Sequence, residues 1–353
     1  MHRVVWATIA TSGPMGQQRY ESEIQTALMR ATVGEWAFRR ASVTTASSGV
    51  AADRRFPDRL NRSLPLVGSR LAGLYLYGRP DLVHRFDLRL PAAFGREVVT
   101  VHDLPPLRFG DEGRLTRSAL DGARRAARII VPSAFAASEI KELIGRSDAE
   151  VIPYGVSDDF RSAASAEDAE LTALGVTSRF VLHAAGASER KNLVGLADAW
   201  RRISSDHDMV QLVLCGPDDR RRDRAFDGLP RVVKTGRLEP FRVASIMRRA
   251  TAVVVPSLYE GFGLPALEGM ACGVHVVAAR RGALPEVCDD AALLVEPDGE
   301  SLAEGIDRVL IDRDLASDLA RRGPVRASEF DWDVAARAHL RVYVEALGVG
   351  SDG

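Results

Sequence analysis

The chain has 353 residues, which is longer than a single hydrophobic core usually supports, so two domains are expected. Its 46% hydrophobic and 27% charged residues are ordinary for a globular protein, and this excludes a disordered or fibrous class. A formal net charge of −1 gives no general attraction to nucleic acid, so no nucleic-acid partner is expected.

The cysteines and the N-terminus indicate where the chain resides. Cys215, Cys272 and Cys288 are too few and too scattered for a disulfide framework or a zinc site, and we expect Cys272 and Cys288 to be buried and reduced. The apolar stretch at residues 4–10 is short and runs directly into polar sequence, unlike a signal peptide, and no run approaches the ~20 apolar residues of a membrane span. We therefore expect a cytoplasmic protein whose only membrane contact would be peripheral, on the inner face.

In the first half, short apolar runs that predict strands alternate with amphipathic runs that predict helices. The predicted strands are residues 3–10, 81–84, 97–102, 128–132 and 150–153. The predicted helices include residues 21–30, 114–127 and 134–144.

The second half restarts the same cycle. Its predicted strands are residues 179–184, 210–215, 231–235, 251–256 and 275–279, and its predicted helices include residues 192–203 and 240–249. Continuous Val/Ile/Leu runs separated by helices are typical of parallel sheets covered on both faces. The pattern predicts an α/β fold with two doubly wound, Rossmann-like domains at residues 1–165 and 166–330, joined around residues 157–175. A ligand is expected in the cleft between them, beyond the carboxyl ends of the strands. A last helix at residues 332–347 follows Asp331 as its N-cap.

The strongest functional signal lies at residues 256–268, where a buried strand runs into a glycine-rich loop that opens a helix. Pro265 suits the first helical turn, because the N–H group that proline lacks has no partner there. The N–H groups of Gly263 and Leu264 would then lie at the positive end of the helix dipole, which is a physical site for a phosphate group.

Two glutamates flank this helix start. Glu260 precedes the helix, and Glu268 falls within it eight residues later. Sugars and riboses offer paired hydroxyls to carboxylates, and each charge-assisted hydrogen bond contributes about 1.5–3 kcal/mol. The simpler interpretation is a helix cap and a solvated glutamate, but the surrounding strand, glycine loop and proline favour a ligand site.

Two adjacent cations, Arg190 and Lys191, follow the first strand of the second half. At a strand end just before a helix, they would neutralise a diphosphate leaving group without a metal. Taken alone, an Arg–Lys pair usually has no binding role and is simply exposed to solvent at the start of a helix.

Residues 256–268 resemble the E-x7-E signature of the large retaining GT-B glycosyltransferase group, family 4 in the usual classification. The resemblance continues in GMACG at 269–273, GALPEV at 282–287 and LVEP at 294–297. It implies that Glu268 binds the donor ribose, that Glu260 faces hydroxyls of the transferred sugar, and that the backbone at Gly263 and Leu264 holds the diphosphate. Phe262, in the same loop, is also assigned to donor binding. It also implies that Lys191 and Arg190 clamp the phosphates. Many relatives carry a further arginine where this chain has residues 186–188.

The resemblance assigns further donor-side loops. Gly236 and Arg237, in the sequence TGRL at 235–238, match a loop that passes close to the base and phosphates. Gly13 and Gly16 occupy the place of a flexible glycine loop over the donor, although the proline at position 14 stiffens this version.

The first half resembles the acceptor side of the same group. His102 and Asp103 end a predicted strand in VTVHDL at 99–104, and IPYGV at 152–156 also matches. The resemblance implies that His102 contacts the transferred sugar, with Asp103 orienting the imidazole. It further implies that the helix after residues 330–333 crosses back to pack on the first domain. A histidine at a strand end is otherwise most often structural.

The expected activity is therefore that of a retaining hexosyltransferase. The donor is expected to be a nucleotide-diphosphate sugar, with GDP-mannose favoured, and the acceptor a glycan, a lipid-linked sugar or a small molecule; no cofactor or metal is expected. A phosphorylase, an epimerase or a silent binding protein of the same fold is the alternative. A nicotinamide-dependent enzyme is a second one, because residues 261–266 spell G-x-G-x-x-A, but Arg280 and Arg281 stand where that motif needs an acid.

Membrane contact is a separate expectation. Residues 53–128 contain 15 arginines and 9 acidic residues, and residues 59–71 mix arginines with leucines as an interfacial segment would. The alternative interpretation is a solvated loop and helix face. Peripheral contact with an anionic membrane is thus one of two open interpretations.

Overall fold

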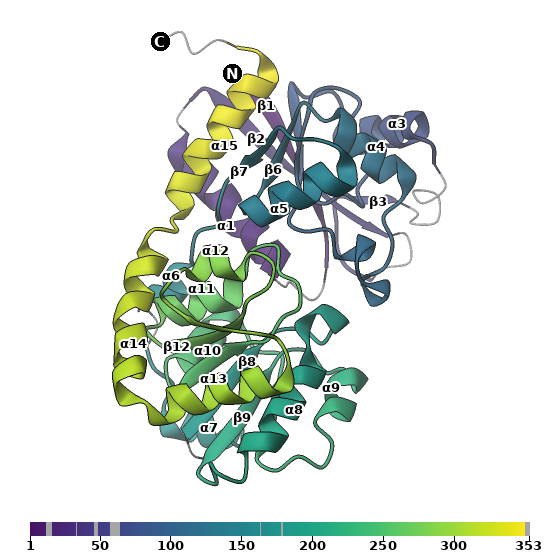
Figure 1. The fold of residues 1–353 in the computed structure, drawn as a ribbon. Helices are drawn as coiled ribbons and strands as arrows, with labels where there is room; N and C mark the ends of the chain where they lie inside the picture. The colour runs from purple at the N-terminus through teal and green to yellow at the C-terminus, as the bar shows by residue number, and fades with distance from the viewer. Residues whose placement is uncertain are drawn as a thin grey trace. The chain divides into compact units, whose positions relative to one another are not determined.

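The structure, a computed structural model, describes residues 1–11, 16–32, 34–45, 49–56, 64–162, 164–177 and 179–349. The chain forms two compact units (Figure 1). The first comprises Met1–Gly155 and Asp331–Gly353, and the second comprises Val156–Phe330. Each unit has its own parallel sheet with helices packed on it.

The first unit contains a seven-stranded parallel sheet in the order β3-β2-β1-β4-β5-β6-β7. Its strands are β1 (His2–Ile9), β2 (Trp36–Thr45), β3 (Arg54–Phe56), β4 (Leu82–Arg85), β5 (Glu97–Thr100), β6 (Arg128–Val131) and β7 (Ala149–Val151). Its helices are α1 (Gly16–Ala31), α3 (Leu66–Tyr77), α4 (Arg117–Arg125), α5 (Ala134–Glu139), continued by a π-helical turn at Ile140–Ile144, and α15 (Trp332–Leu347). Short 3-10 turns lie at Pro105–Leu107 and Gly110–Glu112.

The second unit contains a six-stranded parallel sheet in the order β10-β9-β8-β11-β12-β13. Its strands are β8 (Arg179–Ala184), β9 (Val210–Cys215), β10 (Val232–Gly236), β11 (Ala252–Val255), β12 (His275–Ala279) and β13 (Leu293–Val295). Its helices are α6 (Asp158–Ser162), α7 (Asp168–Ala173), α8 (Leu193–Ile203), α9 (Arg220–Ala225), α10 (Pro240–Met247), α11 (Leu264–Ala271), α12 (Leu284–Cys288), α13 (Gly299–Ile311) and α14 (Arg313–Ser328), with a 3-10 turn at Glu189–Lys191.

Apolar side chains fill both units. In the second unit, the inner faces of α8 and α13 pack on the sheet around the fully buried Trp200. In the first unit, one cluster lies between α4, α5 and the β5–β6 side of the sheet, and another between α3 and strands β1, β2 and β4. Buried Val, Ile, Leu and Ala on successive strands account for the parallel sheets that the sequence predicts.

The structure adds strands that the apolar pattern did not predict. β2 carries Arg39 and Arg40 in its middle, so it lacks the continuous apolar run of a central strand. β3 and β13 have three residues each, which is too short for a periodic signal. β3, β7, β10 and β13 form the sheet edges, where one side of the strand needs no partner.

The chain passes from the first unit to the second between Gly155 and Val156 and returns between Phe330 and Asp331. The expected join at residues 157–175 belongs to the second unit, because Phe160 of α6 is fully buried there and the N–H of Ala166 donates to the carbonyl of Ser245. Asp331 caps α15, as predicted, by accepting from the N–H groups of Asp333 and Val334. In the described part of the chain, no helix is long and apolar enough to cross a bilayer.

Candidate active site

The second unit places its candidate residues at the point where the strand order reverses. β8 and β11 are parallel neighbours, and the chain continues outward from them in opposite directions, to β9 and to β12. Lys191 follows β8, and Glu260 follows β11. Loops after neighbouring parallel strands meet at one sheet edge, and such a switch point is where doubly wound sheets bind ligands.

Glu260 is the centre of a buried polar cluster. Its Oε1 accepts hydrogen bonds from Lys191 Nζ at 2.6 Å and from Ser257 Oγ at 2.8 Å. Its Oε2 lies 3.4 Å from Arg190 Nη1. The Glu260 and Lys191 residues are only 6% and 9% exposed. The structure thus brings together Glu260, Lys191 and Arg190, three of the four predicted catalytic residues.

The ionisation of Glu260 follows from these contacts. Burial alone would raise the pKa of its carboxyl group. The charges of Lys191 and Arg190 and the hydrogen bonds from Lys191 and Ser257 outweigh burial, and the pKa of Glu260 falls below its ordinary value. Glu260 is therefore a carboxylate at neutral pH, able to accept hydrogen bonds but not to donate a proton.

Asn192 joins the two loops of this cluster, a role that was not predicted from the sequence. Its backbone is left-handed, with φ 55°. Its Nδ2 donates to the carbonyl of Pro256 at 2.9 Å and to the carbonyl of Pro297 at 2.7 Å, while its Oδ1 accepts from the N–H of Gly195. The side chain therefore caps α8 and ties the Lys191 turn to the segment that leads into Glu260. In the sequence, the only hint of this capping role is that asparagine tolerates a left-handed backbone.

Gly282 packs closely against the backbone of Glu260. Its φ is +59°, and a Cβ built on it would lie 2.5 Å from the Glu260 carbonyl oxygen and 2.8 Å from the Glu260 nitrogen. The N–H of Ala283 donates to the Glu260 carbonyl at 2.9 Å. The GALPEV segment thus fixes the backbone of the Glu260 loop, and this packing requires a glycine at position 282.

The start of α11 has the geometry that its sequence predicts. Gly263 is the N-cap with φ 107°, and Pro265 lies in the first turn. In the described residues, no oxygen accepts a hydrogen bond from the N–H of Gly263 or Leu264. Phe262 is buried and packs edge-to-face on Phe330. Bare amides at a helix N-terminus favour an anion.

Glu268 lies within α11 and is 5% exposed. Leu264 begins the same helix and Gly263 is its N-cap, so α11 and its cap together carry three of the predicted donor-binding residues.

The first unit holds His102 in a buried aromatic setting. The residue follows β5, and its Nδ1 is hydrogen-bonded to the hydroxyl of Tyr154. The rings of His102 and Tyr20 pack edge-to-face, with their centroids 4.8 Å apart. Burial lowers the pKa of His102 to about 4, although Asp87 and the carbonyl of Phe86 oppose this shift. The imidazole is therefore neutral at pH 7. Nε2 is also buried and accepts or donates no hydrogen bond in the described residues, and the contact of His102 with the transferred sugar stays a prediction.

Gly16 is the first residue of α1, and it is exposed. Gly13, the other predicted glycine of the donor loop, lies outside the described residues. In the ranges that the structure describes, no three His, Cys, Asp or Glu side chains gather as metal ligands would. All three cysteines are free and buried, and burial raises the pKa of Cys272 and of Cys288 to about 12.

Comparison with known families bears directly on this geometry. The family described as Glycosyl transferases group 1 matches residues 166–326, and the family described as Glycosyltransferase Family 4 matches residues 14–160. Between them the two families account for most of both units. The chain is a group 1 glycosyltransferase of the family 4 type.

Curated relatives of this glycosyltransferase include two mannosyltransferases. O-antigen chain mannosyltransferase B of Escherichia coli is 27% identical, over 76% of this chain and 74% of its own length. Phosphatidyl-myo-inositol mannosyltransferase of Mycobacterium leprae is 28% identical, over 86% of this chain and 85% of its own. A D-inositol 3-phosphate glycosyltransferase of Corynebacterium jeikeium is 37% identical, but the match spans only 32% of this chain and 28% of that protein.

Solved structures confirm the predicted GT-B fold class. Sucrose-phosphate synthase from Thermosynechococcus elongatus matches with a TM-score of 0.78 at 22% identity, over 99% of this chain and 100% of that one. An Anabaena protein solved in complex with UDP-glucose matches with a TM-score of 0.76 at 19% identity, over 97% and 99%. At these identities the likeness concerns the fold.

The remaining predicted residues of the glycosyltransferase lie at two other strand ends. Gly236 closes β10 with φ +69°, its carbonyl accepts from the N–H of Gly216, and the exposed Arg237 follows it. Arg281, after β12, pairs with Glu296 at 2.7 Å. A nicotinamide-binding site would need an acid after β12, so the family assignment and this position agree.

Proposed function

We propose that this glycosyltransferase moves a hexose from a nucleotide-diphosphate sugar to an acceptor hydroxyl, with retention of the anomeric configuration. The observation that carries the proposal is the contact between Lys191 and Glu260 at the reversal of strand order, beside the bare amides that open α11. The acceptor classes are a glycan, a lipid-linked sugar or a small molecule.

Lys191, Arg190 and the α11 N-terminus form the proposed diphosphate site. Transfer breaks the bond between the anomeric carbon and the phosphate oxygen, so negative charge develops on the diphosphate. Preorganised cations and helix amides stabilise such charge without a metal. Lys191 pairs with Glu260 in the structure, so the lysine is already oriented and charge-balanced when a donor enters.

Glu260 and Glu268 are proposed to hold the donor by its hydroxyls. Glu260 is a carboxylate with two cations beside it, so it accepts hydrogen bonds from the transferred sugar without becoming protonated. Glu268, on α11, is proposed to accept from the ribose hydroxyls. Phe262, Gly236, Arg237 and Gly16 are assigned to the donor by family resemblance, and so is the contact of His102 with the sugar.

The names of related proteins support a nucleotide-sugar donor. Two relatives that cover three quarters or more of this chain are named mannosyltransferases, and a protein of the same fold was solved with UDP-glucose. GDP-mannose is the donor that we propose to test first.

Retention is proposed to proceed on one face of the sugar. The acceptor oxygen bonds to the anomeric carbon on the side from which the diphosphate leaves, and the acceptor proton passes to the departing phosphate. No protein side chain has to become a covalent intermediate. The residues of this chain then act by positioning and by charge stabilisation.

The experiment is donor turnover by the wild type and by Glu260→Ala, after a thermal-shift screen of nucleotide sugars. We expect Glu260→Ala to lose at least about a hundredfold in turnover while it stays folded, because the transferred sugar loses its carboxylate partner. Proton NMR of the product should give the anomer of the donor, and a chelator should leave turnover unchanged. Full activity of Glu260→Ala would refute the assignment, and an inverted product would refute retention.

A further inference from the structure

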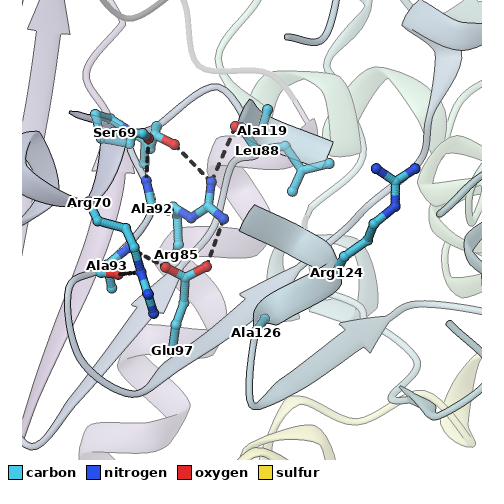
Figure 2. A network of polar contacts seen from close by, with 12 residues as sticks. Ser69, Arg70, Arg85, Leu88, Ala92, Ala93, Glu97, Ala119, Arg124 and Ala126 are labelled. Carbon is cyan, nitrogen blue, oxygen red and sulfur yellow. Dashed lines mark hydrogen bonds and ion pairs between the residues drawn. The ribbon is translucent and has the colours of Figure 1, made fainter. Parts of the chain in front are cut away.

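Helix α3 of the first unit is fixed in one orientation by its inner face (Figure 2). Ser69 Oγ accepts a hydrogen bond of 3.0 Å from the N–H of Ala92, and Arg70 Nε donates to the carbonyl of Ala93 at 3.2 Å. A Cβ built on Gly73 would lie 2.0 Å from the Ala92 carbonyl oxygen, so the helix backbone lies directly against this segment. α3 therefore cannot rotate about its axis without losing these contacts.

The segment that holds α3 is itself anchored by a buried ion pair (Figure 2). Arg85 Nη2 donates to Glu97 Oε1 at 2.7 Å, and both side chains are buried. Arg85 Nη1 donates to the carbonyl of Leu90 at 2.8 Å, and Glu97 accepts from the N–H of Ala93. The surface that α3 presents to solvent is thus set by a rigid support.

That outward surface is apolar. Val67, Leu71 and Tyr75 are 71%, 55% and 63% exposed and recur at every fourth residue, so they form one line along the helix, called here the α3 stripe. Arg70 is the only charged residue of the twelve in α3. Single exposed apolar residues are common on protein surfaces, but a continuous line of large apolar side chains on a rigid helix marks a docking surface.

Arginines surround the α3 stripe. The guanidinium of Arg54 lies over the ring of Tyr75, 5.6 Å from its centroid. Between α3 and α4 lies a groove of about 610 Å³, called here the α3–α4 groove, whose lining includes Arg70, Arg124 and Arg125. Asp121 is the acidic residue in that lining, and Arg124 Nη1 pairs with it at 2.8 Å.

The stretch of sequence that contains α3 has a strongly one-sided charge. Residues 36–80 contain eight arginines and two aspartates, with no lysine or glutamate. One of the two aspartates, Asp53, accepts from the N–H of Ser42. An apolar line with cations on both sides fits a surface that offers hydrocarbon beneath a layer of negative charge.

We infer that the α3 stripe and the α3–α4 groove dock the protein on an anionic lipid bilayer. The α3 stripe enters the boundary between headgroups and acyl chains, and lipid phosphates pair with Arg125 and Arg124 in the groove. At twelve residues, α3 is about 18 Å long, which suits a helix lying in the plane of the interface. An anionic bilayer fits this surface better than a folded protein partner, because the excess of arginine over acidic residues in residues 36–80 matches a uniformly negative surface.

Docking also favours the lipid-linked acceptor among the three acceptor classes. This second step rests on the proposed function, whereas docking itself does not. Vesicle binding and donor binding are measured separately, so one can fail while the other holds.

The test is cosedimentation of the full chain with vesicles of phosphatidylcholine, with and without phosphatidylglycerol, at low and high salt. We expect binding to the anionic vesicles at low salt, weaker binding at high salt, and little binding to phosphatidylcholine alone. Absence of binding to anionic vesicles at low salt would overturn the inference, and so would equal binding to both compositions.

Four variants locate the surface. Leu71→Ser and Tyr75→Ser should each weaken vesicle binding about tenfold, since each removes one apolar side chain from the interface. Arg125→Gln should weaken it about fivefold. Val334→Ser, which changes a 54% exposed valine on α15 of the same unit, is the matched control and should bind like the wild type.

Thermal melting of each variant checks that it is folded. If Leu71→Ser and Tyr75→Ser bind like Val334→Ser, the α3 stripe is not the docking surface. Sedimentation velocity tests the other occupant: a concentration-dependent dimer that Leu71→Ser abolishes would mean that a second copy covers the stripe, and the inference would be wrong.

Discussion

Lys191 Nζ and Glu260 Oε1 lie 2.6 Å apart, although 69 positions separate the two residues in the chain. The contact is buried, and it joins the loops that follow two neighbouring strands, β8 and β11. The Lys191–Glu260 contact is therefore expected to contribute both to the stability of the fold and to donor turnover, and variants can separate the two contributions.

The first prediction separates them with a double variant. Lys191→Met should destabilise the protein by about 3 kcal/mol, because the buried charge of Glu260 is then balanced by the more distant Arg190 alone. Adding Glu260→Gln should recover most of that loss but none of the turnover. Urea denaturation and donor turnover of both single variants and of the double variant measure this. Strictly additive losses of stability would contradict the coupling.

The second prediction concerns Asn192. Asn192→Ala should cost about 3 kcal/mol, because two hydrogen bonds and a helix cap are lost and alanine is strained at φ 55°. Asn192→Gly relieves the strain and should cost about 1 kcal/mol less.

Both Asn192 variants should lower turnover, because the Lys191 turn is no longer tied to the carbonyl of Pro256. Chemical denaturation and steady-state kinetics are the measurements. Wild-type turnover in Asn192→Gly would mean that this tie is not needed for activity.

The third prediction compares two glycines with similar backbones. Gly282 and Gly228 have φ of +59° and +69°, so alanine is strained at both positions by about 1 kcal/mol. Only at Gly282 would the new Cβ meet the backbone of Glu260, whereas nothing lies within 4 Å of it at Gly228. Gly282→Ala should therefore reduce donor turnover at least about tenfold by moving Glu260, and Gly228→Ala should leave turnover unchanged. Equal turnover in the two variants would show that the Glu260 backbone tolerates the shift.

The fourth prediction concerns pH. Glu21 is buried in α1, and its Oε1 accepts from Gln17 Nε2 at 3.1 Å. Burial raises the pKa of Glu21 to about 8, and the negative charge of Asp87 adds to the rise. The folded protein therefore holds a proton that the unfolded chain releases above about pH 4.5, so this group makes the protein less stable as pH rises toward 8.

Glu21→Gln removes that dependence. The variant should gain stability relative to wild type by about 1.4 kcal/mol for each pH unit between pH 5 and 8. Urea denaturation of both proteins at three pH values in this range tests the slope. A difference that does not change with pH would mean that Glu21 ionises normally.

The sequence predicted most strands of both sheets and missed β2, β3 and β13. The predicted strands at residues 179–184, 210–215 and 275–279 coincide with β8, β9 and β12, because central parallel strands need continuous apolar runs. β2 contains two arginines and β3 consists of Arg54, Arg55 and Phe56, so neither strand shows a continuous apolar run.

The candidate site shows a similar division. Glu260, Lys191 and the start of α11 could be predicted because strand ends, glycines and charges are local features of the sequence. The roles of Asn192 and Gly282 could not, because each depends on a contact between segments far apart in the chain. The hydrogen bond between His102 and Tyr154 is of the same kind, since it joins residues 52 positions apart.

The most direct test of the account is calorimetric titration with GDP, UDP and their monophosphates, on the wild type and on Lys191→Met. We predict that one diphosphate binds at least about tenfold more tightly than its monophosphate to the wild type, and that Lys191→Met abolishes this difference. Equal binding of the diphosphate by both proteins, or no binding of either diphosphate by the wild type, would contradict the claim that Lys191 and its partners form the donor site.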